Sequence, residues 1–308
     1  MEILVTGGAG FIGSNLTFRL VEDGHDVTVA DNLTSGNKKN IAGFKGEFIK
    51  CDVSKPDIFE KLKNKKYDVI FHEAAITDTT YSDDKEMVRA NVDGYKNILS
   101  IAEKSRAALV YASSAATYGR GKSPMNEDQK PDPLNAYAVS KKKMDDITKQ
   151  VLKRGTLSII GLRYFNVYGP RESFKGKSSS MIYQLYFQME AGKRPKIFKF
   201  GEQARDFVYV KDVVAANIKA MKKTLKGESG IFNVGTGRLA SFNRLIKELN
   251  KNLGANFEPE YFDNPYGFYQ NVTEADMELS NEILGFRAGY DVEKGIADYA
   301  EFLRGNVK

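Results

Sequence analysis

A tyrosine and a lysine four residues apart, Tyr137 and Lys141, form a pair suited to proton transfer near neutral pH. On one face of a helix, the positive charge of the lysine stabilises the phenolate and brings the pKa of the tyrosine toward neutrality. The same Tyr-x-x-x-Lys spacing occurs four times in the chain, so context must select among the pairs. The other three are Tyr81/Lys85, Tyr118/Lys122 and Tyr290/Lys294.

Only the Tyr137/Lys141 pair has a hydroxyl partner in a suitable place. The preceding strand-like run AALVYASS ends in Ser113 and Ser114, and a serine at the carboxyl end of a parallel strand faces the ligand crevice. Gly119 and Gly121 discourage a helix at Tyr118, and the remaining two pairs lie in polar, charged stretches. We therefore expect Tyr137 to act in hydride-transfer chemistry as an acid/base.

A glycine-rich turn at the N-terminus indicates where a cofactor would bind. The segment EILVTGGAGFIGSNL places Gly7, Gly8, Gly10 and Gly13 between a predicted strand and a predicted helix. Glycines permit a tight turn and let backbone N–H groups approach a pyrophosphate at the helix N-terminus. The next predicted strand, DVTVAD, ends in Asp31, where an acidic ribose ligand is expected. The sequence predicts dinucleotide binding.

The choice between NAD and NADP stays open at this point. Asp31 favours a ribose 2′-hydroxyl, whereas Asn32, Lys38 and Lys39 follow closely and a lysine can balance a 2′-phosphate. Asp52 and Val53, at the end of the third predicted strand, are either adenine neighbours or an ordinary strand terminus.

These residues need a parallel sheet to position them. Runs that are apolar nearly throughout alternate with helical segments, which is typical of parallel strands covered on both faces. The strand-like runs are EILVTG, DVTVAD, EFIKCDV, YDVIFHEAA, AALVYASS and LSIIGLRYF. The prediction is an α/β protein: a Rossmann-type doubly wound parallel sheet with a smaller C-terminal α/β substrate domain. We place the dinucleotide domain at residues 1–167 with about 205–237, and the substrate domain at about 168–204 and 238–308.

Composition excludes several classes of protein. The chain has 308 residues, 42% hydrophobic, without an apolar run that approaches the roughly 18 residues of a membrane span. We expect a cytoplasmic protein without a secretory signal, because the first residues enter a strand and Cys51 is the only cysteine. Cys51, His25 and His72 give no ligand set for a structural zinc. The net charge of +6 is scattered without interleaved aromatics, so we expect no nucleic-acid partner.

Three segments, GGAGFIG, YASSAATYG and YAVSK, resemble the extended short-chain dehydrogenase/reductase superfamily. Further segments resemble one branch, the ADP-L-glycero-D-manno-heptose 6-epimerases: HEAAITDTT, RYFNVYGPRE-x-x-KG, RDFVYVKDV and GIFNVGTGR. The resemblance implies an NADP enzyme, with NAD as the alternative, that inverts C-6″ of an ADP-linked heptose through a transient keto intermediate. Such a sugar belongs to lipopolysaccharide cores. A nucleotide-sugar substrate and a homo-oligomer are expected, with neither membrane nor nucleic acid as partner.

The resemblance also assigns roles at the redox centre. Tyr137 is the acid/base, Lys141 binds the nicotinamide ribose and tunes Tyr137, and Ser114 hydrogen-bonds the reacting oxygen, with Ser113 as the alternative. Further cofactor contacts that it implies are Phe11, Ile12, Ala74, Ala75, Asn91 and Val167.

At the substrate end, the resemblance makes Lys175 a second acid/base, across the ketone from Tyr137. The alternative is a solvated lysine in the loop RESFKGKSSS. Asn166, Arg205 and Tyr269 are expected to contact substrate, although an Asn turn, an Arg205–Asp206 arrangement and packing are the respective alternatives. Gln184 and Phe198 complete the expected contacts. Lys177 and Gln184 replace the expected Ser and His, and the segment 199–204 is one residue shorter than in the branch.

Two rival functions are kept. Related dehydratases carry an Asp-Glu pair after the catalytic hydroxyl, where this chain has Ala115 and Ala116, so dehydration is not expected. UDP-sugar 4-epimerases share the Ser, Tyr and Lys and are the alternative enzyme. A catalytically silent dinucleotide sensor is the alternative from another class.

Overall fold

The largest unit of the protein is a parallel sheet of seven strands. The computed structural model describes residues 1–62, 65–78, 81–264 and 270–306. The sheet has the strand order β10-β6-β5-β4-β1-β2-β3 and every pairing is parallel. Its strands are β1 (Glu2–Thr6), β2 (Asp26–Asp31), β3 (Glu47–Lys50), β4 (Val69–His72), β5 (Ala108–Ser114), β6 (Ile159–Tyr164) and β10 (Gly230–Val234). The predicted doubly wound sheet is confirmed.

Helices cover both faces of this sheet, which is why its strands are apolar nearly throughout. One face packs against α1 (Phe11–Glu22) and α6 (Val210–Thr224). The other face packs against α2 (Ile58–Lys61), α3 (Asp84–Ser105) and α4 (Ala136–Arg154). The strand order reverses direction between β1 and β4, and ligands of such sheets bind at the carboxyl ends beside that reversal.

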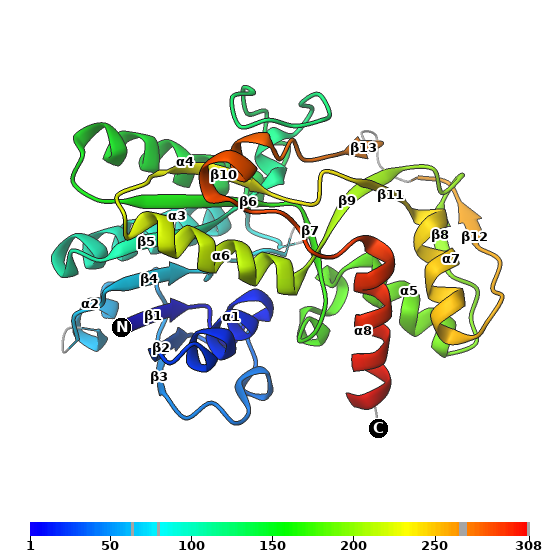
Figure 1. Ribbon diagram of the computed structural model, residues 1–308, viewed down its shortest axis with the longest axis horizontal. Coiled ribbons are helices and arrows are strands. Elements are labelled where there is room, and N and C mark those ends of the chain that lie inside the picture. The colour runs from blue at the N-terminus through cyan, green and yellow to red at the C-terminus, as the bar shows by residue number, and fades with distance from the viewer. Residues whose placement is uncertain (63–64, 79–80, 265–269, 307–308) are drawn as a thin grey trace.

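A second, smaller unit lies beside the carboxyl ends of the strands (Figure 1). Strand β9 (Ala204–Tyr209) pairs with β7 (Asn166–Tyr168), β11 (Leu239–Ser241) and β13 (Val272–Thr273), and β8 (Lys196–Phe198) pairs with β12 (Glu260–Phe262). Helices α5 (Met181–Glu190), α7 (Phe242–Leu253) and α8 (Val292–Asn306) share a separate hydrophobic cluster with β7 and β9. Short helical turns are η1 (Lys38–Ile41), η2 (Ala115–Tyr118), η3 (Ser173–Ser178) and η4 (Ser280–Leu284).

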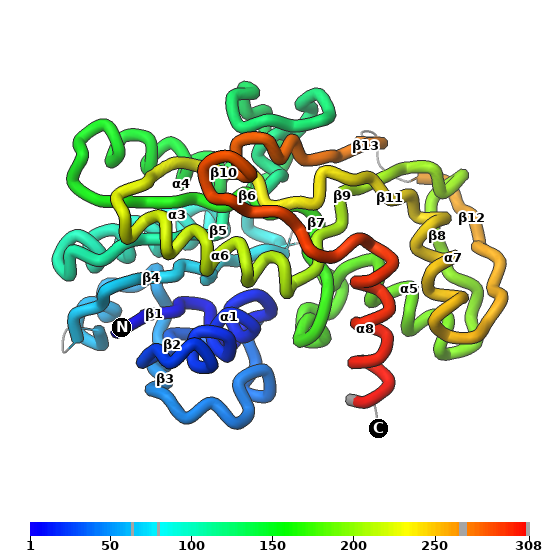
Figure 2. The backbone as a smooth tube through the Cα atoms, viewed as in Figure 1, coloured from blue at the N-terminus to red at the C-terminus, as the bar shows by residue number. Residues whose placement is uncertain are grey.

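The chain passes between the two units more than once, as Figure 2 shows. It leaves the large sheet after β6, returns through α6 to β10, and leaves again into β11 and α7. The third predicted strand is shorter than expected, so Asp52 and Val53 lie in the turn after β3. Within the described residues, no helix is long and apolar enough to cross a membrane, and no cluster of His, Cys, Asp and Glu has the arrangement of a metal site.

Candidate active site

The glycine-rich turn, residues 7–13, links β1 to α1 with almost no space for side chains. Gly7 has a φ of 69°, and a Cβ on it would lie 2.6 Å from the backbone nitrogen of Ala74 after β4. A Cβ on Gly13 would lie 2.2 Å from the carbonyl oxygen of Gly7. Gly10 is the N-cap of α1, with no side chain to cover the first N–H groups of the helix. This cradle fits the pyrophosphate of a dinucleotide, because the free N–H groups and the helix dipole attract phosphate.

Asp31 at the end of β2 supports this turn. One carboxylate oxygen accepts a hydrogen bond from the backbone N–H of Ala9 at 3.0 Å, and the other accepts from that of Leu33 at 2.7 Å. Burial raises the pKa of Asp31, and these two hydrogen bonds oppose the rise. Asp31 is therefore bound to the turn itself, beyond any contact that it makes with a ribose.

The redox residues meet at the carboxyl edge of β5. Asn135 caps α4 by accepting from the N–H of Ala138, which places Tyr137 and Lys141 on the first turns of the helix. The ammonium of Lys141 is buried, donates to the carbonyl of Ala112 at 2.6 Å and lies 5.8 Å from the centre of the Tyr137 ring. Burial lowers the pKa of Lys141 to about 8. Burial raises the pKa of Tyr137, contrary to the shift toward neutrality expected from Lys141, and a hydrogen bond with Ser114 opposes that rise.

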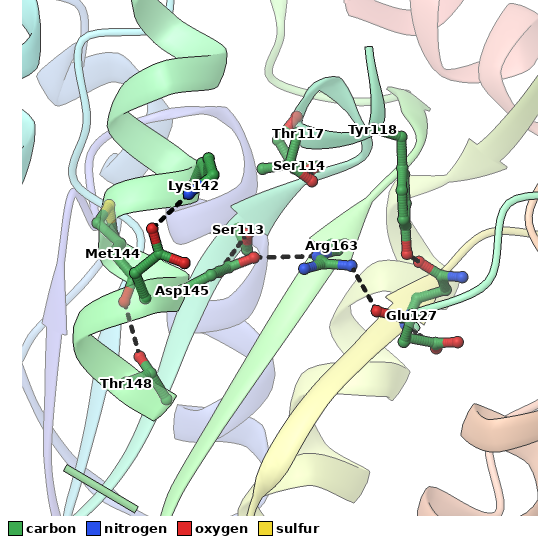
Figure 3. A network of polar contacts seen from close by, with 12 residues as sticks. Ser113, Ser114, Thr117, Tyr118, Glu127, Lys142, Met144, Asp145, Thr148 and Arg163 are labelled. Carbon is green, nitrogen blue, oxygen red and sulfur yellow. Dashed lines mark hydrogen bonds and ion pairs between the residues drawn. The ribbon is translucent and has the colours of Figure 1, made fainter. Parts of the chain in front are cut away.

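Ser113 and Ser114 point to different partners. The hydroxyl of Ser113 donates to Asp145 at 2.8 Å, while that of Ser114 accepts from the N–H of Ala116 beside Tyr137. Asp145 is buried and pairs with the buried guanidinium of Arg163 at 3.0 Å (Figure 3). Ser114 is thus the serine on the side of Tyr137, and Ser113 belongs to the network behind it.

A residue that the sequence analysis missed, Glu73, lies close enough to Tyr137 and Lys141 to affect the pKa of both. It follows β4 and accepts a hydrogen bond from the Tyr164 hydroxyl at 2.9 Å, which in turn accepts from the Asn217 amide at 2.8 Å. Burial raises the pKa of Glu73 to about 7, and the positive charge of Lys141 opposes the rise. The sequence does contain a signal for Glu73, since it directly follows an apolar strand in the segment HEAA. Residues at the carboxyl end of a parallel strand face the ligand crevice.

Lys175 lies on η3 and contacts the first residue of α1. Its ammonium is 5.3 Å from the centre of the Phe11 ring, and Phe11 is the first residue of α1. Burial lowers the pKa of Lys175, and the negative charge of Glu172 opposes this. The side chain is half-buried against the glycine-rich turn, so water reaches it less than the surface-lysine alternative supposes. Its role in catalysis stays a prediction.

Other predicted cofactor residues line the same edge of the sheet. Asn91 is buried and exchanges hydrogen bonds with the backbone of Ile76, next to Ala74 and Ala75, and it donates to Ser140 beside Lys141. Asn32 accepts from the N–H of Thr34, and Asp52 accepts from Ser54. Ile12 and Val167 pack against the hydrophobic core beside α1 and α6, and Val53 packs against the core beside α3. Lys38 is exposed, and its ammonium lies over the Phe48 ring.

The predicted substrate residues gather on the smaller unit. Asn166 donates to the carbonyl of Asp206, and Arg205 donates to the carbonyls of Ala204 and Asn271. Asp206 itself accepts from Thr236, Gly237 and Ala275. Gln184 donates to the carbonyls of Lys177 and Ser179, and the Phe198 ring packs edge-on against Phe262. Tyr269 lies outside the described residues. Ligand contact by these residues stays a prediction.

The rejected Tyr-x-x-x-Lys pairs have other environments. Tyr118 is fully buried, donates to Asn233 at 2.7 Å and ends a short turn at Gly119, so no helix brings Lys122 beside it. Tyr81 is exposed, and the Lys294 ammonium lies 4.3 Å from the centre of the Tyr290 ring in the first turns of α8.

A profile of the NAD dependent epimerase/dehydratase family matches residues 3–235, which include the glycine-rich turn, Ser114, Tyr137 and Lys141. The chain belongs to this family. Among members of the NAD dependent epimerase/dehydratase family, it is 40% identical over 317 residues to an ADP-L-glycero-D-manno-heptose-6-epimerase from Brachyspira hyodysenteriae, covering 98% of this chain and 97% of that protein.

Solved structures of two epimerases have a similar backbone. The Helicobacter pylori ADP-L-glycero-D-manno-heptose-6-epimerase is 40% identical with a TM-score of 0.91, covering 98% of this chain and 96% of that chain. The Thermotoga maritima UDP-glucose 4-epimerase, solved with UDP-glucose, is 30% identical with a TM-score of 0.92, covering 100% of both chains. The backbone alone therefore does not separate the two kinds of epimerase.

Proposed function

We propose that this protein is an ADP-L-glycero-D-manno-heptose 6-epimerase. The proposed reaction converts ADP-D-glycero-D-manno-heptose to the L-glycero form at C-6″. The observation that carries the proposal is 40% identity over nearly the whole chain to a relative of that name. It is supported by Ser114, Tyr137 and Lys141 at the carboxyl edge of β5 and by the Lys175 ammonium beside Phe11 of the glycine-rich turn. The rival UDP-sugar 4-epimerase shares the redox residues, and its backbone is as similar.

The cofactor we propose is NADP, held by the glycine-rich turn. When bound, the nicotinamide supplies a hydride acceptor and donor for the carbinol carbon of the sugar. Both Asp31 oxygens accept backbone hydrogen bonds, so this acid is partly occupied with the turn, and exposed Lys38 is available to balance a 2′-phosphate. NAD is the alternative that the family name allows.

The chain's own residues handle the protons. Tyr137 takes the hydroxyl proton of the substrate as the ketone forms, and Ser114 holds the reacting oxygen in place. Buried Lys141 supplies positive charge that favours the phenolate of Tyr137. The ketone then receives hydride on its opposite face, and Lys175 supplies the proton to the new alkoxide. Ala115 and Ala116 provide no acid or base for elimination of water.

The test is to incubate the protein with ADP-D-glycero-D-manno-heptose and to follow the L-glycero product by NMR. We expect conversion by the protein and little conversion by Tyr137→Phe, which has the same shape without the acid/base. Conversion of UDP-galactose in place of the heptose would support the rival enzyme. Cofactor binding without any epimerisation would support the dinucleotide sensor. The proposed homo-oligomer is to be measured in the same preparation by light scattering.

A further inference from the structure

The loop that carries Lys175, residues 169–180 (the Lys175 loop), has no buried apolar side chain in its central part, 173–178. Its helical turn η3 contains no buried side chain, and Phe174 is exposed. Gly176 has a φ of 55°, which breaks the turn after Lys175. A segment of this kind opens at low free energy unless hydrogen bonds hold it in place. The structure shows two sets of such bonds, and both come from residues that the proposed mechanism does not use.

The first set closes the loop on itself. Glu172 is fully buried, and its carboxylate accepts from the N–H of Gly169 at 3.1 Å, the N–H of Ser180 at 2.6 Å and the hydroxyl of Ser180 at 2.8 Å. One side chain therefore joins the two ends of the loop. These donors offset the free-energy cost of burying the carboxylate. Removal of the carboxylate would leave the N–H groups of Gly169 and Ser180 and the Ser180 hydroxyl without their acceptor. The same carboxylate hydrogen-bonds to buried Tyr299 on α8.

The second set fastens the loop to the glycine-rich turn. The amide of Asn15 donates both to the carbonyl of Phe11 and to that of Pro170, each at 2.9 Å. The amide of Asn40 donates both to the carbonyl of Ala9 and to that of Arg171, each at 3.2 Å. Each asparagine thus bonds the turn with one hydrogen and the loop with the other.

Arg171 strengthens this attachment. Its guanidinium donates to the Asn15 oxygen at 3.2 Å and lies 4.4 Å from the centre of the Phe18 ring on α1. Its φ of 73° is uncommon for a residue with a side chain, so the backbone there is held by its surroundings. Arg171 therefore attaches the loop to α1, the helix whose N-terminus is predicted to bind the cofactor phosphates.

We propose that Glu172, Asn15 and Asn40 are positioning residues for Lys175, which hold the Lys175 loop against the glycine-rich turn. This inference rests on the proposed function for its effect on turnover, but not for its effect on the loop. It predicts that the second acid/base is set in place by the cofactor turn and not by the smaller unit alone. A shift of about 1 Å in a catalytic group is enough to lower turnover about 10²-fold.

The loop is tested first, without substrate. Trypsin cleavage after Lys175 and Lys177 is timed by mass spectrometry for the full-length protein, for Asn15→Ala/Asn40→Ala and for Glu172→Ala. We expect cleavage to be about tenfold faster in both variants, because a loop that has lost hydrogen bonds needs less free energy to open locally. The control is Asn252→Ala, whose side-chain amide donates to the carbonyl of Glu248 in its own helix. Cleavage at the rate of the control would overturn the inference.

Turnover is tested next, on the same variants loaded with NADP⁺. We expect kcat for the heptose to fall about 10²-fold while KM and the NADP⁺ dissociation constant stay near those of Asn252→Ala. Asn15→Gln in place of Asn15→Ala keeps both amide hydrogens and should restore part of kcat. Loss of NADP⁺ binding in proportion to kcat would mean that the asparagines support only the turn, and it would also overturn the inference. If the parent protein has no epimerase activity, the proposed function fails while the cleavage result still decides the loop.

Discussion

At the scale of single residues, the environment of each side chain decides which members of the predicted site are able to exchange protons. Ser113 and Ser114 are neighbours in sequence, but the hydroxyl of Ser113 donates to Asp145 and only Ser114 lies with Tyr137. Lys141 and Lys175 both have pKa values lowered by burial, which brings amines closer to the range where they serve as acids and bases.

Replacement of Lys175 tests the second acid/base. We expect Lys175→Met to lower kcat about 10²–10⁴-fold, the usual effect of losing one acid/base group. The NADP⁺ dissociation constant, measured by calorimetry, should change little. Lys175 also lies beside Phe11 of the glycine-rich turn. A large loss of NADP⁺ affinity with unchanged kcat would therefore assign Lys175 to phosphate binding instead. Lys177→Met, in the same loop but exposed, is the matched control.

Replacement of Glu73 tests whether its carboxyl is neutral in the folded protein. Burial raises its pKa to about 7, whereas an unfolded glutamate titrates near 4.3. The stability that it contributes is therefore fully present below about pH 4.3 and is lost as pH rises through about 7. Glu73→Gln still accepts from Tyr164 but does not titrate. Its melting temperature relative to the parent should rise between about pH 5 and about pH 8.

The control for this measurement is Glu228→Gln, since Glu228 is exposed. A constant difference in melting temperature between Glu73→Gln and the parent at both pH values would contradict the raised pKa. The same substitution bears on activity, because the negative charge of Glu73 raises the pKa of Lys141 against its burial. In Glu73→Gln the alkaline limb of the pH–rate profile should move to lower pH.

At the scale of secondary-structure elements, one buried ion pair connects α4 with the two strands beneath it. Asp145 on α4 accepts from Arg163 on β6 and from Ser113 on β5, and Arg163 also donates to the carbonyl of Glu127 (Figure 3). Asp145 accepts from the hydroxyl of Tyr111 on β5 as well. The Arg163 guanidinium lies 4.8 Å from the centre of the Tyr118 ring. This network fixes the helix that carries Tyr137 and Lys141 to the strand that ends in Ser114.

Two adjacent aspartates on α4 give a matched comparison. Asp145→Asn should lower the free energy of unfolding by about 3–5 kcal/mol, because it leaves the buried charge of Arg163 without its partner. Asp146→Asn should change it by about 0.5 kcal/mol or less, because Asp146 pairs with Lys142 at the surface. Urea unfolding of both variants measures the difference. Equal losses would show that the buried pair adds nothing beyond a surface pair.

At the scale of the whole molecule, the cofactor turn, the redox residues and the Lys175 loop meet where the larger sheet adjoins the smaller unit. An open depression of about 770 Å³ lies elsewhere, lined by Pro124, Thr236, Gly237, 274–278, Asn281, Glu282 and Arg287. It includes none of the predicted catalytic residues.

Cofactor choice is a property of the folded molecule and is measured on it as a whole. We expect NADP⁺ to raise the melting temperature more than NAD⁺ at equal concentration. A ligand that binds only the folded state adds about 2.7 kcal/mol at 100 times its dissociation constant. Lys38→Ala should reduce the shift with NADP⁺ and leave that with NAD⁺ unchanged. A larger shift with NAD⁺ would reverse the proposed preference.

The sequence by itself determined the class of fold and predicted Tyr137 and Lys141 as one pair on a helix. Apolar strands alternating with helices require a parallel sheet covered on both faces, and the glycine spacing after β1 requires a close approach of backbone to a ligand, because both follow from local pattern and steric limits. Tyr137 and Lys141 share a helix, so their separation follows from helical geometry. The domain boundaries and the ligand contacts of the substrate residues remain predictions.

Only the tertiary structure decided which distant groups meet. It brought Ser113 to Asp145 and Glu73 to Tyr164. It also joined Asn15 on α1 and Asn40 on η1 to a loop more than a hundred residues later in the chain. These contacts depend on strand order and on the direction of each side chain, which no local pattern contains. Burial then set the pKa values of Glu73, Lys141 and Lys175, because a charge is stable only where water or a partner reaches it.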